Sequence, residues 1–483
     1  MIHALLLLVA LQQEIPDHPD KLKYPSLKFE VPDAGSLRST LAKGTVVYAA
    51  EDPTLPLVHL QIQFRGGSFH DPKGKEGLAD LWAAVLRTGG TKGRDPQALD
   101  EELDFLAAEF GISAGELTGS ISLSLLAKDL DRGLAILDDV LRFAEFRQEK
   151  LDLARAQMLD RIKARNDSTG SIEKREANLL LYGPEHPSNR LATRKSLESI
   201  TREDLIEFHK RFMAPEGMIV AAAGNFSRAD LVKKLDAVFS WESAVGPPAD
   251  VVIPEPNPTP GVHCFNKDDK NITQGRVTMG HVGIRLDCPD LHAIRIMNYI
   301  YGGGGFSSRL TQRVRTDEGL AYDVDSSFQP GIRYVGTFRI QFQSKTESCA
   351  FAMQLCLEEL KKMQEAAPDA KVVDEAKKFF IDGFPAFFFS TKFKTVQTFA
   401  TAELNGYPKD YYKVYRETIA AVTPADVQRV AKQYMKPEKL VIVCVGNIGA
   451  MVQGDGKHKV TLSDFGPVKN VPLPDPETME RTK

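Results

Sequence analysis

Two stretches of this chain share one pattern, and this pattern decides the fold. They read TREDLIEFHKRFMAPEGMIVAAAGN at Thr201–Asn225 and TPADVQRVAKQYMKPEKLVIVCVGN at Thr423–Asn447, and they align without a gap at a constant offset of 222 residues, from 201 to 423. In each copy a Thr followed three residues later by Asp predicts a helix start, Pro breaks the helix, and an apolar run ending in Gly-Asn predicts a buried strand closed by a turn. Because this period is too long for a solenoid repeat, the sequence predicts that a whole α+β domain is duplicated.

The segment between the two copies separates the two domains. Residues 245–261 read VGPPADVVIPEPNPTPG, and the prolines exclude a regular helix and favour an extended, stiff connector. The chain is therefore divided into a possible signal peptide, an extended lead-in, an N-terminal domain, a Pro-rich linker, a C-terminal domain and a polar tail. The predicted boundaries are, in this order, 1–13, 14–40, 41–244, 245–262, 263–450 and 451–483.

Composition and charge exclude several classes of protein. With 483 residues, of which 42% are hydrophobic and 26% charged, most of the chain can bury an ordinary core. Lys plus Arg number 61 against 65 for Asp plus Glu, so no overall basic field favours nucleic acid as a partner. The five cysteines form no CxxC pair, and we interpret them as buried or free thiols. They are Cys264, Cys288, Cys349, Cys356 and Cys444.

The chain starts with its one long apolar run, Ile2–Leu11. This run is too short to span a bilayer, which takes about 20 residues, and it predicts no transmembrane anchor. Its length is that of a signal peptide, although no Lys or Arg precedes it. We expect an exported, for example periplasmic, protein; the alternative is a cytoplasmic protein with an apolar N-terminal segment.

One helix carries a face on which catalytic chemistry is expected. In Gly66–Thr91, GGSFHDPKGKEGLADLWAAVLRTGGT, the apolar residues at 78, 81, 82, 85 and 86 form one helical stripe that predicts packing into the core. Asp80, Ala83 and Ala84 lie on another stripe, at the spacing with which a helix presents two metal ligands and a base. In this chain two of these three side chains are methyl groups, which can neither bind a metal nor accept a proton.

This segment resembles the insulinase/pitrilysin zinc-peptidase family, whose inverted motif His-x-x-Glu-His follows Gly-Leu-Ala. Asp80, Ala83 and Ala84 occupy the three motif positions. The resemblance continues through LYGPEHPSNR and GGGGFSSRLTQRVRTDEGLAYDVDSS (302–327) and covers roughly residues 41–450. It implies duplicated αβ domains, similar to those of the mitochondrial processing peptidase, that form a half-shell.

The resemblance also implies that the catalytic metal is absent. The family's third ligand, a Glu, would fall at Asp160 or Arg161, and neither is Glu. Zinc needs about three protein ligands and an open position for water. No two of the ten histidines are close enough in sequence to form HxxH or HxxxH, and neither GxSxG nor a P-loop is present. We therefore expect no catalytic residue and no zinc in this chain alone.

The second half keeps a different element. The pattern of residues 307–318 predicts a helix that Ser307 or Ser308 caps and Gly319 ends, and the following residues alternate like a half-buried strand. From the residues alone, Arg315 complements a helix C-terminus and Tyr322 belongs to the core. The resemblance implies another role, because the family has an Arg and a Tyr seven positions apart, in a GLAY context, that hold the substrate carbonyl opposite the zinc.

Together these features predict a non-catalytic, substrate-binding subunit of an insulinase-type peptidase heterodimer. Such a chain is inactive alone and supplies Arg315 and Tyr322 to a zinc-bearing partner, and the pair encloses and cleaves an unfolded peptide. The stretch Gly111–Leu126 is either a sheet edge that this peptide extends or a plain core strand. The alternative function is a structural or peptide-binding scaffold without a proteolytic partner, similar to the core subunits of respiratory complexes. A working metalloprotease is a third, disfavoured interpretation.

Overall fold

The computed structural model describes residues 22, 28–243, 246, 250–267 and 272–481. The chain divides into two compact units, Met1–Val31 and Pro32–Lys483. The predicted signal peptide lies outside the described residues. None of the described helices has the length and the apolar content needed to cross a membrane.

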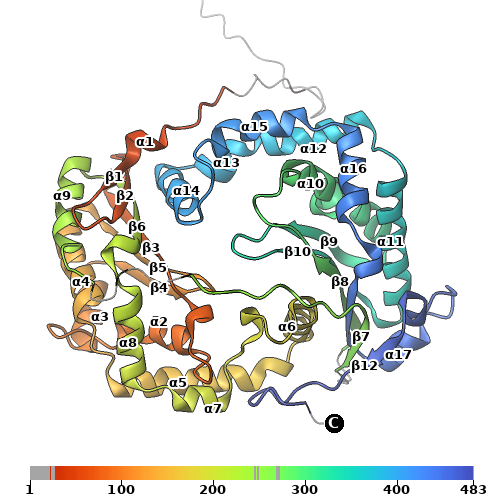
Figure 1. The fold of residues 1–483 in the computed structure, drawn as a ribbon, viewed down its shortest axis with the longest axis horizontal. Helices are drawn as coiled ribbons and strands as arrows, with labels where there is room; N and C mark the ends of the chain where they lie inside the picture. The colour runs from red at the N-terminus through yellow and green to blue at the C-terminus, as the bar shows by residue number, and fades with distance from the viewer. Residues whose placement is uncertain (1–21, 23–27, 244–245, 247–249, 268–271, 482–483) are drawn as a thin grey trace, which may run out of the picture. The chain divides into compact units, whose positions relative to one another are not determined.

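Two six-stranded sheets form the centres of the two domains (Figure 1). The first sheet contains, in spatial order, β1 (Arg38–Thr40), β2 (Val46–Glu51), β6 (Met218–Gly224), β3 (Leu57–Arg65), β5 (Thr118–Leu126) and β4 (Glu109–Ala114). The second contains β12 (Val468–Asn470), β7 (Gly261–Asn266), β11 (Val441–Gly446), β8 (Gln274–Val282), β10 (Thr337–Lys345) and β9 (Ala321–Gln329). Five strands follow the same order in both sheets, and the predicted α+β class with two sheet-containing domains is confirmed.

The sixth strand of each sheet comes from a different end of the chain. β1 belongs to the predicted lead-in and pairs antiparallel to β2, after one helical turn, α1 (Ala34–Leu37). β12 belongs to the predicted polar tail and pairs parallel to β7. These two strands are the part of the architecture that the duplication does not account for.

Helices surround both sheets. In the first half they are α2 (Leu78–Thr88), α3 (Pro96–Phe105), α4 (Leu130–Phe143), α5 (Gln148–Lys163), α6 (Thr169–Tyr182), α7 (Arg194–Ser199), α8 (Arg202–Phe212) and α9 (Arg228–Val238). In the second half they are α10 (Leu291–Asn298), α11 (Cys349–Glu365), α12 (Ala370–Asp382), α13 (Phe384–Phe389), α14 (Lys392–Leu404), α15 (Tyr411–Ala421), α16 (Pro424–Tyr434) and α17 (Ile448–Gln453).

The repeated sequence unit forms the same local structure twice. Thr201 and Thr423 are the N-caps of α8 and α16, and each forms a capping box with the Asp three residues later. Pro215 and Pro437 each begin a short 3₁₀ turn after the helix, and the following strands β6 and β11 are buried along their whole length. The predicted order of helix, break, strand and turn is confirmed in both copies.

The two halves exchange one helix. α6 of the first half packs on β11 and β8 of the second sheet, and α14 of the second half packs on β6 and β2 of the first. The repeat offset takes Thr169, the first residue of α6, to Thr391, the N-cap of α14, so the exchange is reciprocal. Because each sheet is covered by a helix from the other half, residues 32–483 form a single compact unit.

Polar contacts support both exchanged helices. On the α14 side, Glu403 accepts hydrogen bonds from Arg38 Nη2 at 2.8 Å and from Tyr48 Oη at 2.6 Å. On the α6 side, the buried Glu173 accepts a hydrogen bond from Thr278 Oγ1 at 2.7 Å. These contacts join residues far apart in sequence and fix the register of each helix on its sheet.

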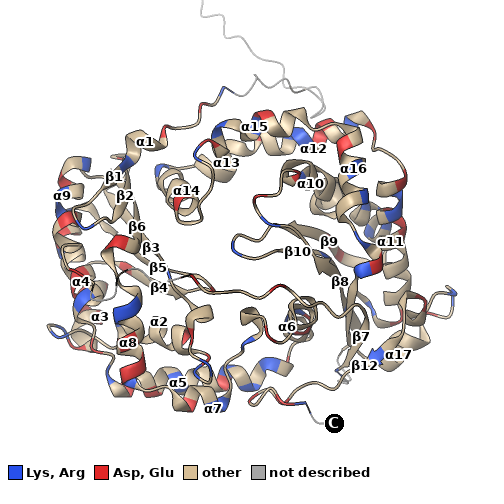
Figure 2. Cartoon of the chain, in the orientation of Figure 1, with Lys and Arg blue, Asp and Glu red and all other residues tan. Residues whose placement is uncertain are grey.

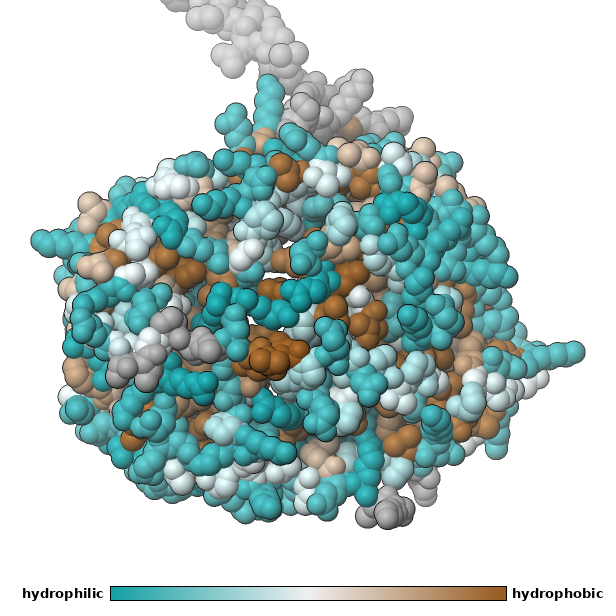
Figure 3. Space-filling model, in the orientation of Figure 1, coloured by the Kyte–Doolittle hydropathy of each residue, from teal (hydrophilic) through white to brown (hydrophobic). Residues whose placement is uncertain are grey.

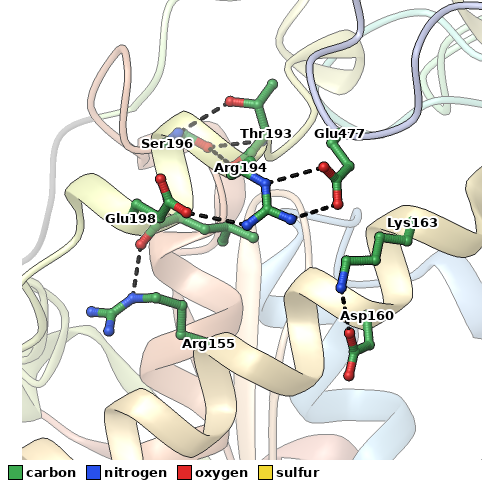
Figure 4. Close-up of polar contacts among 9 residues, drawn as sticks. Arg155, Asp160, Lys163, Thr193, Arg194, Ser196, Glu198 and Glu477 are labelled. Carbon is green, nitrogen blue, oxygen red and sulfur yellow. Dashed lines mark hydrogen bonds and ion pairs between the residues drawn. The ribbon is translucent and has the colours of Figure 1, made fainter.

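The C-terminal segment packs against both halves instead of forming a free tail. We call Val468–Arg481 the C-terminal strap. After β12, the backbone carbonyl of Glu477 accepts a hydrogen bond of 2.8 Å from the backbone N–H of Arg194. The Arg194 side chain also forms an ion pair with the Glu477 carboxylate at 2.7 Å (Figure 4). Further along, Arg481 is paired with Glu176 of α6, whose side chain is 1% exposed. The strap therefore connects the second sheet with helices of the first half.

The surface agrees with the balanced charge of the sequence. Figure 2 shows basic and acidic residues interspersed along the outer helices, for example α5 and α11, without a continuous basic face in that view. In Figure 3 hydrophilic residues cover most of the same face, and apolar patches lie between them. The five cysteines are free, and four of them are buried. The interpretation as buried or free thiols is confirmed.

Candidate functional site

Helix α2 presents the predicted motif face away from the core. The helix begins after Gly77, whose φ of 101° is left-handed and favours glycine. On the motif face Asp80 and Ala84 are exposed and Ala83 is half-buried. Two of the three motif positions therefore present a methyl group, which cannot coordinate a metal. The predicted core stripe is buried, as expected, at Leu78, Leu81, Trp82, Val85 and Leu86.

Of the two residues that the sequence proposes for the distal position, Arg161 is the one that lies beside Asp80. Arg161 and Asp80 line the same cavity, which has a volume of about 340 Å³. Asp160 does not line this cavity; its carboxylate accepts a hydrogen bond from Lys163 Nζ at 2.9 Å (Figure 4). A guanidinium repels a cation, so the residue that faces Asp80 opposes metal binding.

The side chains at the motif do not fit a zinc ion. They offer one carboxylate, two methyl groups and one guanidinium, whereas zinc takes about three imidazole, thiolate or carboxylate ligands. Within the part of the chain that the structure describes, no group of three His, Cys, Asp or Glu side chains could hold a metal ion. The residues present at the motif therefore do not provide for a metal-activated water.

His209 illustrates how a histidine near this region is used for packing. Its ring lies on α8, where Nδ1 accepts a hydrogen bond from Trp82 Nε1 at 3.3 Å and Nε2 donates to Leu141 O at 2.9 Å. Burial lowers the pKa of His209 to about 4, because the protonated ring would lose its hydration, and the hydrogen bond to Leu141 O offsets this only in part. The neutral imidazole is therefore a structural acceptor and donor.

We predict that His209 makes the fold sensitive to acid. The unfolded chain has the ordinary His pKa of about 6.5, so between pH 6.5 and 4 it binds more protons than the folded chain, and stability falls as the pH is lowered. We expect the free energy of unfolding to fall by about 1–3 kcal/mol at pH 4. The lower part of this range allows for water in the cavity that the ring borders. The variant His209→Gln keeps a donor and an acceptor. Its free energy of unfolding, measured with urea, should differ less between pH 7 and pH 4.5 than that of the unchanged protein. An unchanged pH dependence in this variant contradicts the prediction.

Arg315 lies in a helical segment that packs on β9, the last strand of the second sheet. The predicted helix 307–318 is present, but Thr311–Asp317 is a π-helix. The Ser308 hydroxyl accepts a hydrogen bond from the Thr311 N–H at 3.3 Å, and Gly319 ends the segment with a φ of 63°. The predicted cap and stop are confirmed, and a π-helical turn is a feature common at functional sites.

The guanidinium of Arg315 is held between two exposed aromatic rings. Its Cζ lies 4.6 Å from the centre of the Phe306 ring and 4.8 Å from that of the Tyr322 ring. Phe306 is 70% exposed and Tyr322 is 81% exposed. Among the described residues none accepts a hydrogen bond from this guanidinium, and no carboxylate lies within 4.0 Å of it. The two ring contacts restrain the guanidinium, and within the described part of the chain its N–H groups have no acceptor.

The interpretation of Tyr322 as a core residue is wrong. In a regular alternating strand Tyr322 would share a face with the buried Val324, but β9 contains one extra residue at this point. Ala321 pairs with Ser344 and Val324 with Phe342, so three steps on β9 match two on β10. This β-bulge turns Tyr322 away from the core, as bulges often do beside functional sites.

The two sets of predicted site residues do not meet within one chain. Glu116, which lines the Asp80 cavity, accepts a hydrogen bond of 2.6 Å from Tyr334 Oη in the turn after β9. Tyr322 lies near the other end of β9. At 3.3 Å per residue it is about 23 Å away from Gln329, the last residue of the strand. Neither Arg315 nor Tyr322 lines the Asp80 cavity. The Arg/Tyr element therefore lies outside this chain's own motif region.

The stretch Gly111–Leu126, predicted to be either a sheet edge or a core strand, includes one strand of each kind. β4 is the last strand of the first sheet, and no other strand among the described residues pairs with its outer edge. β5 lies between β3 and β4, and every second residue in it is buried. The edge available to an extended peptide is thus β4 (Glu109–Ala114).

Sequence reasoning missed Phe306 as part of the site. The signal was present, because a Phe in the turn-forming run GGGGFSS has no helix or strand face with which to enter a core. Its position beside Arg315 depended on the fold of the turn between Gly305 and Ser308 and was not contained in the spacing.

The comparisons with known proteins agree on one family. The model described as insulinase (peptidase family M16) matches residues 46–180, and the model described as peptidase M16 inactive domain matches residues 199–380. Together they cover more than half of the chain. The solved structure of a peptidase M16 inactive domain from Pseudomonas fluorescens is similar with a TM-score of 0.75 and 25% identity, over 86% of this chain and 98% of that one.

Two curated relatives are similar over most of their length. An uncharacterized zinc protease from Rickettsia bellii is 24% identical over 342 residues, which is 69% of this chain and 79% of the relative. The non-peptidase homolog YmxG from Helicobacter pylori is 25% identical over 357 residues, 71% of this chain and 78% of the relative. The chain therefore belongs to the insulinase (M16) peptidase family, as a member that lacks the His-x-x-Glu-His motif.

Proposed function

We propose that this chain is the substrate-binding subunit of an insulinase-type zinc-peptidase heterodimer. In this role it supplies Arg315 and Tyr322 to the zinc site of a partner and contributes one half-shell to the chamber that encloses a peptide. The observation that carries the proposal is the free, oriented guanidinium of Arg315 between two exposed rings, in a chain whose own motif face cannot hold zinc.

The chemistry of the Arg/Tyr element suits a peptide carbonyl. When water attacks the carbonyl, negative charge develops on its oxygen, and fixed donors lower the energy of that state. The Arg315 guanidinium provides charged N–H donors and the Tyr322 hydroxyl a neutral one. Because Tyr322 is exposed, Arg315 is half-buried beside it and neither lines the cavity of the chain's own motif region, both are placed to contact an acyl group held by another subunit.

Additional support comes from the open edge of β4. An extended peptide that pairs with this strand gains main-chain hydrogen bonds independent of its sequence. The edge lies in the first sheet and the Arg/Tyr element in the second, so a chain with both can hold a peptide at two separate places.

The direct test is purification of the chain alone and together with a zinc-bearing relative from the same genome. Alone, we expect no cleavage of an unfolded peptide and less than one bound zinc per ten chains by elemental analysis. With the partner, cleavage should appear, and a chelator should remove it. Chelator-sensitive cleavage by the isolated chain would sink the proposal, and so would a partner that is equally active without it.

A further inference from the structure

The cavity beside α2 is lined by three arginines. Arg161 comes from the last turns of α5, Arg165 from the 3₁₀ turn that follows, and Arg190 from the residue after a second 3₁₀ turn, Pro187–Asn189. The cavity volume of about 340 Å³ lies in the range of small-ligand sites. Three arginines thus line the cavity in which the motif face offers a single carboxylate, Asp80.

In the part of the chain that the structure describes, none of these three cations forms an ion pair. Among the described residues, no carboxylate oxygen lies within 4.0 Å of a guanidinium nitrogen of Arg161, Arg165 or Arg190. Arg190 donates only to backbone, at 2.6 Å to Phe69 O and 3.1 Å to Asp71 O, and its Nε is buried without a partner. Arg165 donates to a backbone carbonyl of the strap, and Arg161 makes no hydrogen bond within the described chain.

The acidic groups of the cavity only partly balance this charge. The buried Asp71 accepts hydrogen bonds from the N–H groups of Gly77 and Ala79, at 2.9 and 3.0 Å, and burial raises its pKa to about 7. Glu116 is engaged by the Tyr334 hydroxyl. Burial and the neighbouring charge of Arg175 lower the pKa of Arg165 to about 10, as expected for a cation with no counter-ion. Asp80 is the third acidic residue of the wall and interacts with the charge of Arg161. Because Asp71 is partly protonated at neutral pH, the three arginines leave a small excess of positive charge in the cavity.

We infer that this cavity binds a carboxylate of a peptide, at the place where a motif-bearing relative would bind a cation. A guanidinium fork matches the two oxygens of a carboxylate. A singly charged carboxylate is favoured over a doubly charged phosphate, because Asp80 also lines the cavity and repels the second charge. The carboxylate comes from an acidic side chain or from a chain terminus. This inference does not depend on the proposed role of Arg315 and Tyr322.

The test measures binding of three short peptides to the isolated full chain by calorimetry. One has an internal Glu and an amidated C-terminus, the second has Gln in its place and a free C-terminus, and the third has Gln and an amide. At least one of the first two should bind at least tenfold more tightly than the third, and which one does so identifies the source of the carboxylate. Inorganic phosphate is the competing probe.

Three variants assign the effect to this cavity. Arg161→Gln should weaken carboxylate binding at least tenfold, Asp80→Asn should strengthen it, and Lys163→Gln, on the same helix but paired with Asp160, should leave it unchanged. Circular dichroism confirms that each variant is folded. Equal binding of all three peptides, tighter binding of phosphate, or unchanged affinity in Arg161→Gln would each overturn the inference. Because no partner is present in this assay, its failure leaves the cleavage test above unaffected.

Discussion

Replacement of Arg315 by Ala is expected to lower kcat/KM of the reconstituted heterodimer by roughly 100-fold, the typical cost of removing one donor to a developing oxyanion. The reason is that Ala removes the charged N–H edge that the rings of Phe306 and Tyr322 hold in place. Tyr322→Phe, which keeps the ring and removes one hydroxyl donor, should lower kcat/KM by roughly tenfold or more. The measurement is steady-state cleavage of a peptide at equal occupancy of the complex.

Two further variants separate a substrate contact from a structural effect. Arg313→Ala lies on the same helical segment but removes only an exposed pair with Glu318, and should leave kcat/KM within about twofold. Arg315→Lys keeps the charge without the planar fork and should recover only part of the activity. If Arg315→Ala and Arg313→Ala are equally active in an intact complex, the chain acts as a scaffold without an Arg/Tyr contribution.

Replacement of Glu176 by Gln should lower the free energy of unfolding by about 3 kcal/mol. The Glu176 carboxylate, 1% exposed, is paired with Arg175 at 2.8 Å and with Arg481 of the strap. Gln keeps the shape but leaves two guanidinium groups without their counter-ion, one of them 10% exposed. Urea unfolding at pH 7 measures the change, and the strap should become accessible to protease before the rest of the chain unfolds.

A second, more exposed ion pair of the strap provides the control for Glu176→Gln. Glu477→Gln breaks the ion pair with Arg194, in which the two side chains are 25% and 39% exposed. Solvent screens this pair, so the expected loss is at most about 1 kcal/mol. Equal losses in the two variants would show that the buried pair does not hold the strap.

Local patterns were sufficient for the elements that depend on neighbouring residues. The capping boxes at Thr201 and Thr423, the core stripe of α2 and the stop at Gly319 follow from spacings of three to four residues, and all are present. The polar composition of the C-terminal strap, in contrast, suggested a tail. Its packing depends on β7 and α6, which lie far away in sequence, and no local pattern contains that information.

The sequence by itself determined the duplication and the loss of the metal-binding side chains, because repeats and residue identities are read directly from the chain. Only the tertiary structure decided which residue of α5 faces Asp80, since one step along a helix turns a side chain by about 100°. It also decided that Tyr322 points outward, because a single extra residue in β9 shifts its pairing with β10. Side-chain direction at these two places depends on packing partners far away in sequence.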